Sequence, residues 1–461
     1  MARRESTSAA DEFQNPTTAA LQLVPRRLPT IMFIVTLAAY MIAVTQRSSL
    51  GVAGVVAAER FDAGGAALSS LGVMQMAVYA LMQIPVGMLL DRFGPRVLIL
   101  AGAVAMAAGQ GIVAFAPTLE VAVLGRVLVG IGDATTFVSG LRVIAAWFPQ
   151  RRVPLMQQWF SNLGQFGQFL SAVPFAILLD ATDWTVAFLT TASLSVLVIV
   201  AVTVVLADTP WKRTSGSQVS LRGAFEKLAD AFARPGTRLG FWAHFSSQFA
   251  GTVFALLWGY PVMVQGLGID PRVAALLVVL PMIIGMFAGP WIGLATARWP
   301  LRRSNIVIGL ATLMALAWVG LIVWPGQPPL WYFLLVIVAT GVCGPGSTIG
   351  FDFARTFNPA ASYGSASGIV NIGGFTASAI SMLLIGVGVD FVPRAPDGSI
   401  TWPAFQLALW AIPLMIVIGI GGLLAERRRT RSKLAAEEGV TVAPLWLAVA
   451  RQMRRERATR R

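Results

Sequence analysis

Long apolar runs separated by short polar stretches make up most of the chain. A helix needs roughly 20 consecutive apolar residues to cross the hydrocarbon core of a bilayer. Runs of that length recur about twelve times, so the sequence predicts an all-α polytopic membrane protein with about twelve transmembrane helices. The predicted spans are residues 30–57, 68–90, 97–116, 121–146, 155–179, 185–207, 239–262, 273–296, 304–324, 330–351, 363–389 and 403–425.

The longest polar connection divides these spans into two groups of six. Its spaced apolar side chains predict an amphipathic helix that lies at the membrane surface. We therefore predict, in chain order, a cytoplasmic N-terminal segment, a six-helix bundle, a cytoplasmic linker, a second six-helix bundle and a basic cytoplasmic tail. Their predicted boundaries are 1–29, 30–207, 208–238, 239–425 and 426–461.

The distribution of charge predicts the orientation of these spans. Charged residues make up 12% of the chain and hydrophobic residues 56%, whereas soluble domains carry about 25% charged residues. With both termini in the cytoplasm, 30 of the 35 Lys and Arg lie on the cytoplasmic side and three lie outside, as the positive-inside rule requires. The net charge of +14 is then explained by topology and by anionic lipid headgroups, without a nucleic-acid partner.

Cysteine and histidine usage argues against metal or redox chemistry. The chain has one cysteine, Cys343, and one histidine, His244. An internal disulfide, a cysteine metal cluster and a zinc site are therefore not expected. No catalytic Ser/His/Asp set or nucleotide-binding loop is evident, so we predict neither an enzyme nor a bound cofactor or metal.

Three charged residues lie deep inside predicted spans, away from the span ends: Arg47 in span one, and Arg126 and Asp133 in span four. Seven residues separate Arg126 from Asp133, so both leave the helix on one face, roughly 10 Å apart along the axis, and we expect them to have different partners. Arg47 and Arg126 lie at comparable depth. Two cations that face one cavity need an anion, and a substrate carboxylate or phosphate suits guanidinium geometry. Alternatively, Asp133, Glu59 or backbone carbonyls neutralise them, within a structural ion network.

The two halves contain a weak internal repeat. Asn162-Leu-Gly164 recurs 209 residues later as Asn371-Ile-Gly373, and Trp147-Phe-Pro149 recurs as Phe357-Asn-Pro359 after 210 residues. Two homologous six-helix bundles are the design of many secondary transporters, which bind substrate near the bilayer midplane between the bundles.

A conspicuous motif follows span two: Gly87-Met-Leu-Leu-Asp91-Arg92-Phe-Gly94-Pro-Arg96. It resembles the signature loop of the major facilitator superfamily, which implies two pseudo-symmetric six-helix bundles that work by alternating access. The resemblance implies that Gly87, Asp91, Arg92 and Arg96 form a gate, with Asp91 placed to interact with a helix N-terminus.

A degenerate second copy of the motif follows span eight, from Gly293 to Arg302. It keeps Arg298 but has Ala297 in place of the aspartate, so a weaker latch is expected there. Asp352 lies at the cytoplasmic end of span ten and is also predicted to belong to the gate.

A narrower resemblance runs from span one to span five. Gln46-Arg47-Ser-Ser-Leu-Gly and Arg126-Val-Leu-Val-Gly-Ile-Gly-Asp133-Ala resemble the anion:cation symporter branch of that superfamily. The resemblance implies that Arg47 contacts the anion and that Asp133 carries the coupled proton. The sequence departs from the branch at Gln46, where an aspartate is common, which removes a possible second proton carrier.

Further polar residues are candidates for the same site. Tyr79, Gln165 and Asn371 are predicted to line the cavity; for Tyr79 core packing, and for Gln165 hydrogen bonding between helices, is an equal alternative. His244, one turn from Gln248, is either a proton relay or the partner in a structural hydrogen bond.

The sequence therefore predicts a secondary active transporter of the cytoplasmic membrane that carries a small organic or inorganic anion together with protons. The alternatives are a proton-driven drug or metabolite efflux antiporter and, in another class, a non-transporting membrane sensor. The Gly-Pro antiporter signature is absent from residues 161–171, which disfavours efflux. The expected partners are the anion, protons and membrane lipid, and a monomer is expected.

Overall fold

The computed structural model describes residue 25 and residues 27–62, 65–210, 221–396 and 399–439. Its described elements are all helical, and eleven helical segments among them are long and apolar enough to cross a membrane. The 29-residue helix α5 overlaps the predicted span 68–90 and brings the total to the twelve that we predicted. Most of the predicted segment 1–29 and the end of the predicted tail, residues 440–461, lie outside the described residues.

The first six spans form one bundle. Its elements are α3 (Arg27–Val52), α4 (Gly54–Phe61), α5 (Gly65–Phe93), α6 (Pro95–Phe115), α7 (Leu119–Trp147), α8 (Val153–Leu170), η1 (Ser171–Phe175), α9 (Ala176–Ala181) and α10 (Trp184–Val205).

The last six spans form the second bundle. Its elements are α12 (Pro235–Val253), η2 (Phe254–Trp258), α13 (Gly259–Pro261), η3 (Val262–Gly266), α14 (Pro271–Arg298), η4 (Pro300–Arg302), α15 (Arg303–Ile322), α16 (Leu330–Cys343), η5 (Gly344–Thr348), α17 (Ile349–Phe357), η6 (Ala360–Ser362), α18 (Tyr363–Asp390), α19 (Trp402–Ala408) and α20 (Ala411–Glu438).

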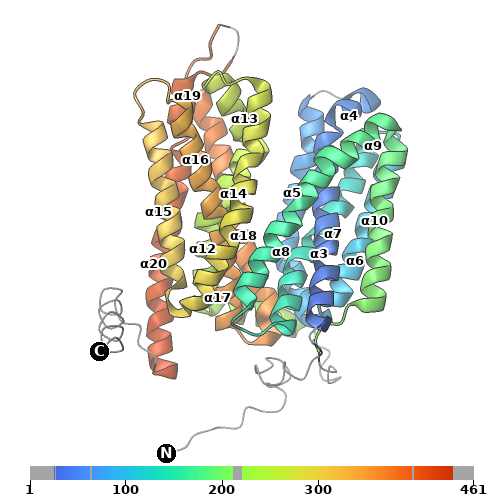
Figure 1. The fold of residues 1–461 in the computed structure, drawn as a ribbon, viewed down its shortest axis with the longest axis vertical. Helices are drawn as coiled ribbons and strands as arrows, with labels where there is room; N and C mark the ends of the chain where they lie inside the picture. The colour runs from blue at the N-terminus through green and yellow to red at the C-terminus, as the bar shows by residue number, and fades with distance from the viewer. Residues whose placement is uncertain (1–24, 26, 63–64, 211–220, 397–398, 440–461) are drawn as a thin grey trace, which may run out of the picture.

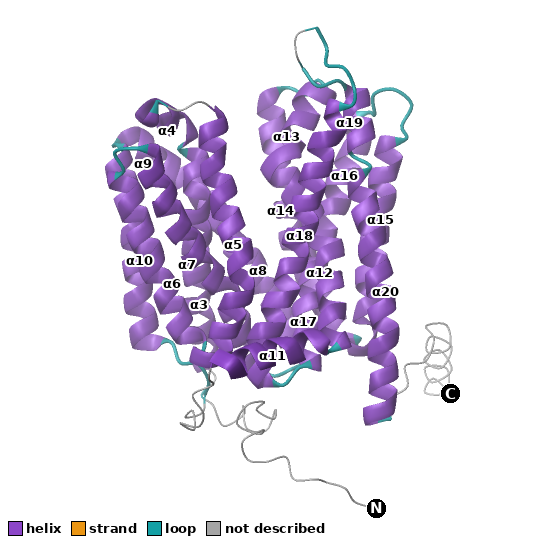
Figure 2. Cartoon of the chain, turned by 180° about the vertical axis from the view of Figure 1, so that it is seen from behind, coloured by secondary structure: helices purple, strands orange, loops and turns teal. Residues whose placement is uncertain are grey.

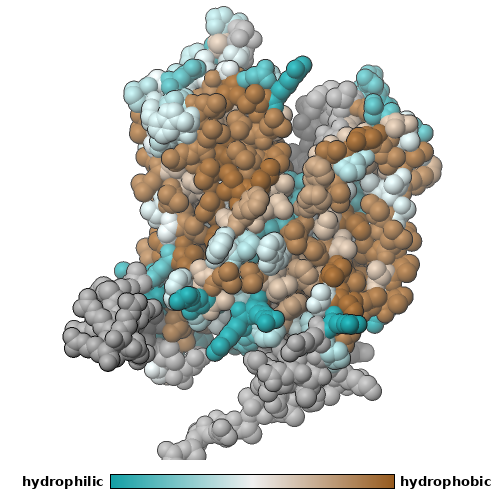
Figure 3. All heavy atoms as spheres, in the orientation of Figure 1, coloured by the Kyte–Doolittle hydropathy of each residue, from teal (hydrophilic) through white to brown (hydrophobic). Residues whose placement is uncertain are grey.

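The two bundles stand side by side and lean together at one end (Figure 1). We call this end the terminal face, because α3 begins and α20 ends there; the opposite end, which carries α4, α9 and α19, is the distal face. The linker helix α11 (Leu221–Ala233) lies across the terminal face beneath both bundles (Figure 2). Figure 3 shows apolar side chains over most of the face in view and a hollow between the bundles at the distal face.

The structure extends the last span beyond its predicted end. We predicted an end at residue 425, but α20 continues as a helix to Glu438. An ion pair holds the start of this extension: the buried Glu426 accepts a bond from Arg238 at the start of α12, with 3.1 Å between Nε and Oε1. This contact fixes the first turn of the extension against the second bundle.

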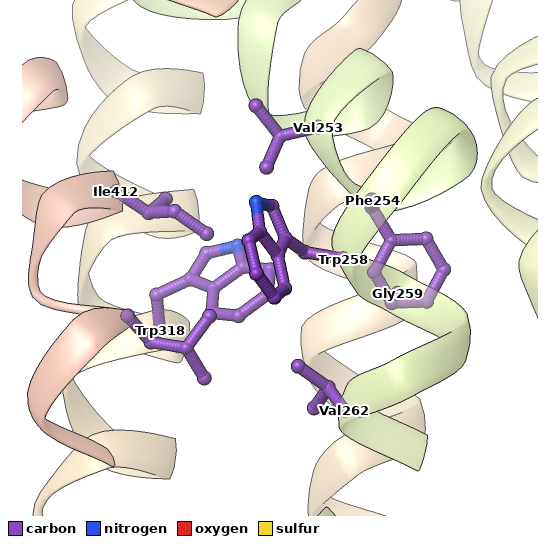
Figure 4. A pocket seen from close by; sticks show the side chains of 8 residues that line it. Val253, Phe254, Trp258, Gly259, Val262, Trp318 and Ile412 are labelled. Atoms are coloured by element: carbon purple, nitrogen blue, oxygen red, sulfur yellow. The ribbon is translucent and has the colours of Figure 1, made fainter. Parts of the chain in front are cut away.

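A small apolar pocket lies within the second bundle (Figure 4). Its lining residues carry no ionisable group. The Trp258 and Trp318 indoles donate their N–H groups to the Met382 carbonyl and the Thr340 hydroxyl. The pocket is therefore a gap in apolar packing and does not offer a site for a polar ligand.

Candidate substrate site and gate

The first bundle holds an ion pair within its spans. Arg47 of α3 donates from Nη1 to Oδ2 of Asp133 of α7 over 3.2 Å. The Asp133 side chain is fully buried, whereas 17% of the Arg47 side chain is exposed. The guanidinium carbon of Arg47 also lies 5.7 Å from the centre of the Tyr79 ring. Arg47 is thus the member of the pair that an entering anion reaches first.

Arg126 occupies a different environment, and only 1% of it is exposed. Its Nη1 donates to the carbonyl of Gln46 over 3.2 Å, and its Nη2 donates to the carbonyl of Arg47 over 2.8 Å and to the side chain of Gln75. Arg126 and Asp133 therefore have different partners, as expected, and backbone carbonyls surround Arg126. This arrangement supports the alternative reading of Arg126 as a structural group, while its predicted contact with substrate stays a prediction.

Gln46 belongs to a buried polar layer that the sequence analysis missed. Its Nε2 donates to the carbonyl of Thr191 over 2.8 Å and to the hydroxyl of Ser195 over 2.6 Å. Gln110 donates to the hydroxyl of Ser49 over 3.3 Å within the same layer. The signal was present in the sequence, since Gln75 and Gln110 stand alone in apolar runs, but the partners come from distant helices.

Three predicted cavity residues lie on two sides of this site. Asn371 of α18 donates to Gln83 of α5 over 2.5 Å, and the Tyr79 ring lies 4.9 Å from that of Phe375, so Tyr79 and Asn371 both lie where the bundles meet. Gln165 donates to the Tyr40 hydroxyl over 2.8 Å and stays within the first bundle.

His244 forms the structural hydrogen bond that we weighed against a proton relay. Its Nδ1 lies 3.2 Å from the carbonyl of Ser347, and its ring packs edge-on against Phe351 at 5.0 Å. Both partners belong to the second bundle, whereas Asp133 belongs to the first. The structure therefore does not bring His244 and Asp133 into direct contact.

Asp91 joins the two bundles at the terminal face. It accepts hydrogen bonds of 2.7 Å from the backbone N–H groups of Gly364 and Ser365, in the first turn of α18, and pairs with Arg142 over 2.7 Å. Gly87 lies one helical turn away, and a Cβ there would lie 2.5 Å from the Gly364 carbonyl oxygen. The aspartate lies at a helix N-terminus, where the sequence had placed it, and the glycine lets the backbones touch.

The other predicted gate residues contact groups of their own bundle. Arg96 donates to the carbonyl of Thr203 in α10, and the Arg92 and Arg298 guanidinium groups lie over the rings that follow them in the chain. Asp352 pairs with Arg355 over 2.6 Å and also with Arg303. The pair with Arg303 fixes α15 to α17 within the second bundle, and the predicted role of Asp352 in the gate stays a prediction.

A second contact line between the bundles depends on Gln158 of α8. Its Nε2 donates to the Pro345 carbonyl over 2.8 Å and to the Thr348 hydroxyl over 2.5 Å. Gly293 of α14 lies against the same helix, and a Cβ there would lie 2.9 Å from the Cα of Leu155. We call this contact the α8 seam, and the contact of α5 with α18 the α5 seam.

Both seams lie in the half of the molecule next to the terminal face. Along α5, the residues that contact the second bundle run from Asp91 out to Tyr79, the midpoint of that helix. The bundles are thus closed at the terminal face and separate towards the distal face (Figures 2 and 3). Arg47 and Asp133 lie beside the point where the closed half ends.

The model of the Major Facilitator Superfamily matches residues 36–382. The chain belongs to the major facilitator superfamily. The solved structure of the proton:xylose symporter XylE, bound to 6-bromo-6-deoxy-D-glucose, matches 88% of this chain and 96% of XylE with a TM-score of 0.66 at 15% identity. That likeness establishes the major facilitator fold, as predicted.

Curated relatives of this major facilitator protein are transporters. The nitrate/nitrite transporter NrtP of Picosynechococcus sp. is 36% identical over 120 residues, which are 26% of this chain and 22% of NrtP. The probable galactarate/D-glucarate transporter GarP of Escherichia coli (strain K12) is 23% identical over 388 residues, 77% of this chain and 86% of GarP. The relatives that are more than 30% identical match the chain over about a quarter of their own length.

The described part of this major facilitator chain contains no group of three or more His, Cys, Asp or Glu side chains that could hold a metal ion. The chemistry that the site offers is an exchange of ionic partners. The pair is partly exposed on the arginine side, so an anion in the cavity would compete with Asp133 for Arg47.

Proposed function

We propose that this protein is a secondary active transporter that moves a small organic or inorganic anion across the cytoplasmic membrane by alternating access, coupled to protons. The observation that carries the proposal is the ion pair between a partly exposed Arg47 and a fully buried Asp133. The substrates after which NrtP and GarP are named, nitrate or nitrite and galactarate or D-glucarate, are anions and support the substrate class.

Coupling follows from competition for one guanidinium. A substrate carboxylate that forms two parallel hydrogen bonds with Arg47 displaces Asp133. The displaced carboxylate is buried, and an ionised carboxylate without a partner is very costly in a low-dielectric interior. Asp133 therefore takes up a proton when the anion binds, so that anion and proton cross together.

Alternating access then requires the two seams to open and the distal half to close. In the proposed orientation both termini are cytoplasmic, the terminal face is the cytoplasmic face, and the conformation described here accepts substrate from outside. The Asp91 latch opens when the bundles rock, which exposes the site to the cytoplasm. We propose that a single chain completes this cycle.

The test uses Asp133→Asn in proteoliposomes. With nitrate, galactonate and galactarate as probes, the variant should keep exchange of labelled for unlabelled anion but lose accumulation driven by a pH gradient. Asp390→Asn is the matched control, since the Asp390 side chain is 68% exposed at the distal end of α18. If the Asp133 variant still accumulates anion in response to the pH gradient, Asp133 is a structural ion and His244 becomes the next candidate.

A further inference from the structure

The charges at the site allow a count of what crosses the membrane in one cycle. We propose that the site carries a singly charged anion together with one proton, so that the full cycle moves no net charge. The inference deepens the proposed function and rests on its coupling of anion to proton.

Asp133 is distinguished from the other buried carboxylates by its partners. Asp91 accepts two backbone N–H groups and an arginine, Asp352 pairs with two arginines, and Glu426 pairs with Arg238 and Arg429. Asp133 pairs with one arginine, and its Oδ1 has no hydrogen-bond partner among the described residues. It is thus the buried carboxylate with the fewest bonds to lose when a substrate takes its partner.

The cationic side of the site offers one exchangeable group. Arg126 is held by two carbonyls of α3 and by Gln75 of α5, all within the first bundle. These partners do not depend on how the bundles are placed, so the Arg126 charge is the same in every state of the cycle. Only Arg47 changes its ionic partner, and one guanidinium fork binds one carboxylate.

The position before Arg47 is built for a neutral amide. Gln46 donates through one Nε2 to the Thr191 carbonyl and the Ser195 hydroxyl. A carbonyl oxygen accepts hydrogen bonds and cannot donate one, so a carboxylate here would face an oxygen. No second proton carrier is therefore supplied at this level of α3.

The other ionisable groups near Asp133 do not change the number of protons that the site exchanges. They are Arg47 and Tyr40 of α3, Tyr79 of α5 and Arg126 of its own helix α7. Tyrosine hydroxyls are neutral near pH 7, and both arginines stay charged. One proton is therefore exchanged at this site in each cycle.

The net charge of Arg47, Asp133 and the bound substrate is zero both in the empty site and in the loaded site. Without substrate, the positive Arg47 and the negative Asp133 cancel. With a monoanion, the bond between Arg47 and Asp133 breaks, a proton from the solution binds an Asp133 oxygen, and the positive Arg47 cancels the charge of the substrate. A dianion would leave one negative charge in the moving site.

The decisive experiment separates the pH gradient from the membrane potential. Full-length protein in proteoliposomes is given nitrate, galactonate or galactarate; galactonate retains one of the two carboxylates of galactarate. One charge that crosses a 100 mV potential changes the accumulation ratio by roughly 50-fold. We expect the pH gradient to drive accumulation of a monoanion. At equal pH, a valinomycin-set potential of about 100 mV should leave the ratio of internal to external monoanion as it is without a potential.

Other outcomes overturn distinct statements. A roughly 50-fold response of monoanion accumulation to the potential overturns the inference but not the proposed coupling. If the protein transports galactarate but neither nitrate nor galactonate, the inference of a singly charged substrate is likewise overturned and the proposed coupling is not. Absence of pH-driven uptake for all three anions overturns the proposed function itself.

The variant Asp133→Asn gives a second reading. Its loaded site holds the positive Arg47, the monoanion and a neutral amide, so its exchange of labelled monoanion should proceed at the same rate with and without the potential. A potential-dependent exchange rate would overturn the charge count. If this variant does not fold, the comparison of pH gradient and membrane potential in the unaltered protein tests the charge count alone.

Discussion

Replacing Asp91 with asparagine should shift the protein away from the conformation that is closed at the terminal face. The aspartate accepts two backbone N–H bonds of 2.7 Å across the α5 seam, one at each carboxylate oxygen. Asparagine has a single acceptor oxygen, so one of these bonds is lost together with the attraction of the charge to the α18 N-terminus. A hydrogen bond to a charged group contributes about 1.5–3 kcal/mol. A loss of about 2 kcal/mol lowers the ratio of closed to open states roughly 30-fold, because a tenfold change corresponds to about 1.4 kcal/mol.

Thiol labelling measures this shift. The native Cys343 is first replaced by serine, and Ala366→Cys serves as reporter, since Ala366 is fully buried in α18 at the α5 seam. The labelling rate of the reporter follows the open fraction when opening is fast relative to labelling. We expect Asp91→Asn to raise this rate roughly 30-fold while anion binding changes only a few-fold.

The control is Asp390→Asn, at the distal end of α18, the helix whose first turn contacts Asp91. The Asp390 carboxylate forms an exposed pair with Arg394 at 3.4 Å, and such pairs contribute about 0–1 kcal/mol. Since the pair lies within one segment, it does not favour either conformation. If Asp91→Asn labels at the rate of the unaltered protein, the latch contributes nothing to closure and the reasoning fails.

Three further substitutions test the site and the seams. Arg47→Lys should weaken anion binding at least tenfold, measured by equilibrium dialysis, because an ammonium cannot form two parallel bonds; an unchanged Kd would contradict substrate contact. Gln158→Leu removes two donor bonds across the α8 seam. At about 0.5–1.5 kcal/mol a bond the loss is about 1–3 kcal/mol, so reporter labelling should rise roughly 5- to 150-fold, whereas Gln168→Leu, exposed on the same helix, should not raise it. Gly364→Val places a side chain against the α5 backbone and should lower the melting temperature more than Gly421→Val, which meets open space.

The fold could be predicted because the membrane restricts the solutions. Backbone groups in hydrocarbon must be satisfied within a helix, so length and hydropathy alone placed the spans. The terminal helix shows the limit of this argument. Residues 426–438 are too charged to be recognised as part of a span, so hydropathy reveals neither that α20 continues through them nor that Glu426 pairs with Arg238 in another helix.

The site could be predicted as a set of charges but not as a set of pairs. Depth along each helix placed Arg47 and Arg126 at a comparable level, with Asp133 roughly 10 Å from Arg126 along its helix. It left open whether the anion, Asp133 or backbone carbonyls would neutralise the arginines. Which arginine meets Asp133 depends on the rotation of α3 against α7, which hydropathy does not encode. The same holds for Gln158, whose partners Pro345 and Thr348 are 187 and 190 residues away.

The repeat explains why the two seams differ in chemistry. An offset of 210 residues maps Arg142 onto Asp352, and an offset of 206 maps Asp91 onto Ala297. In the first bundle Asp91 pairs with Arg142. In the second bundle the position of Asp91 is an alanine, and the position of Arg142 is the carboxylate Asp352, which pairs with Arg303 of its own bundle. The α5 seam is held by a charged latch and the α8 seam by a neutral amide. Because bonds to a charged group are about twice as strong as neutral ones, the α8 seam should separate first when the bundles rock, with Asp91 as the last contact to break.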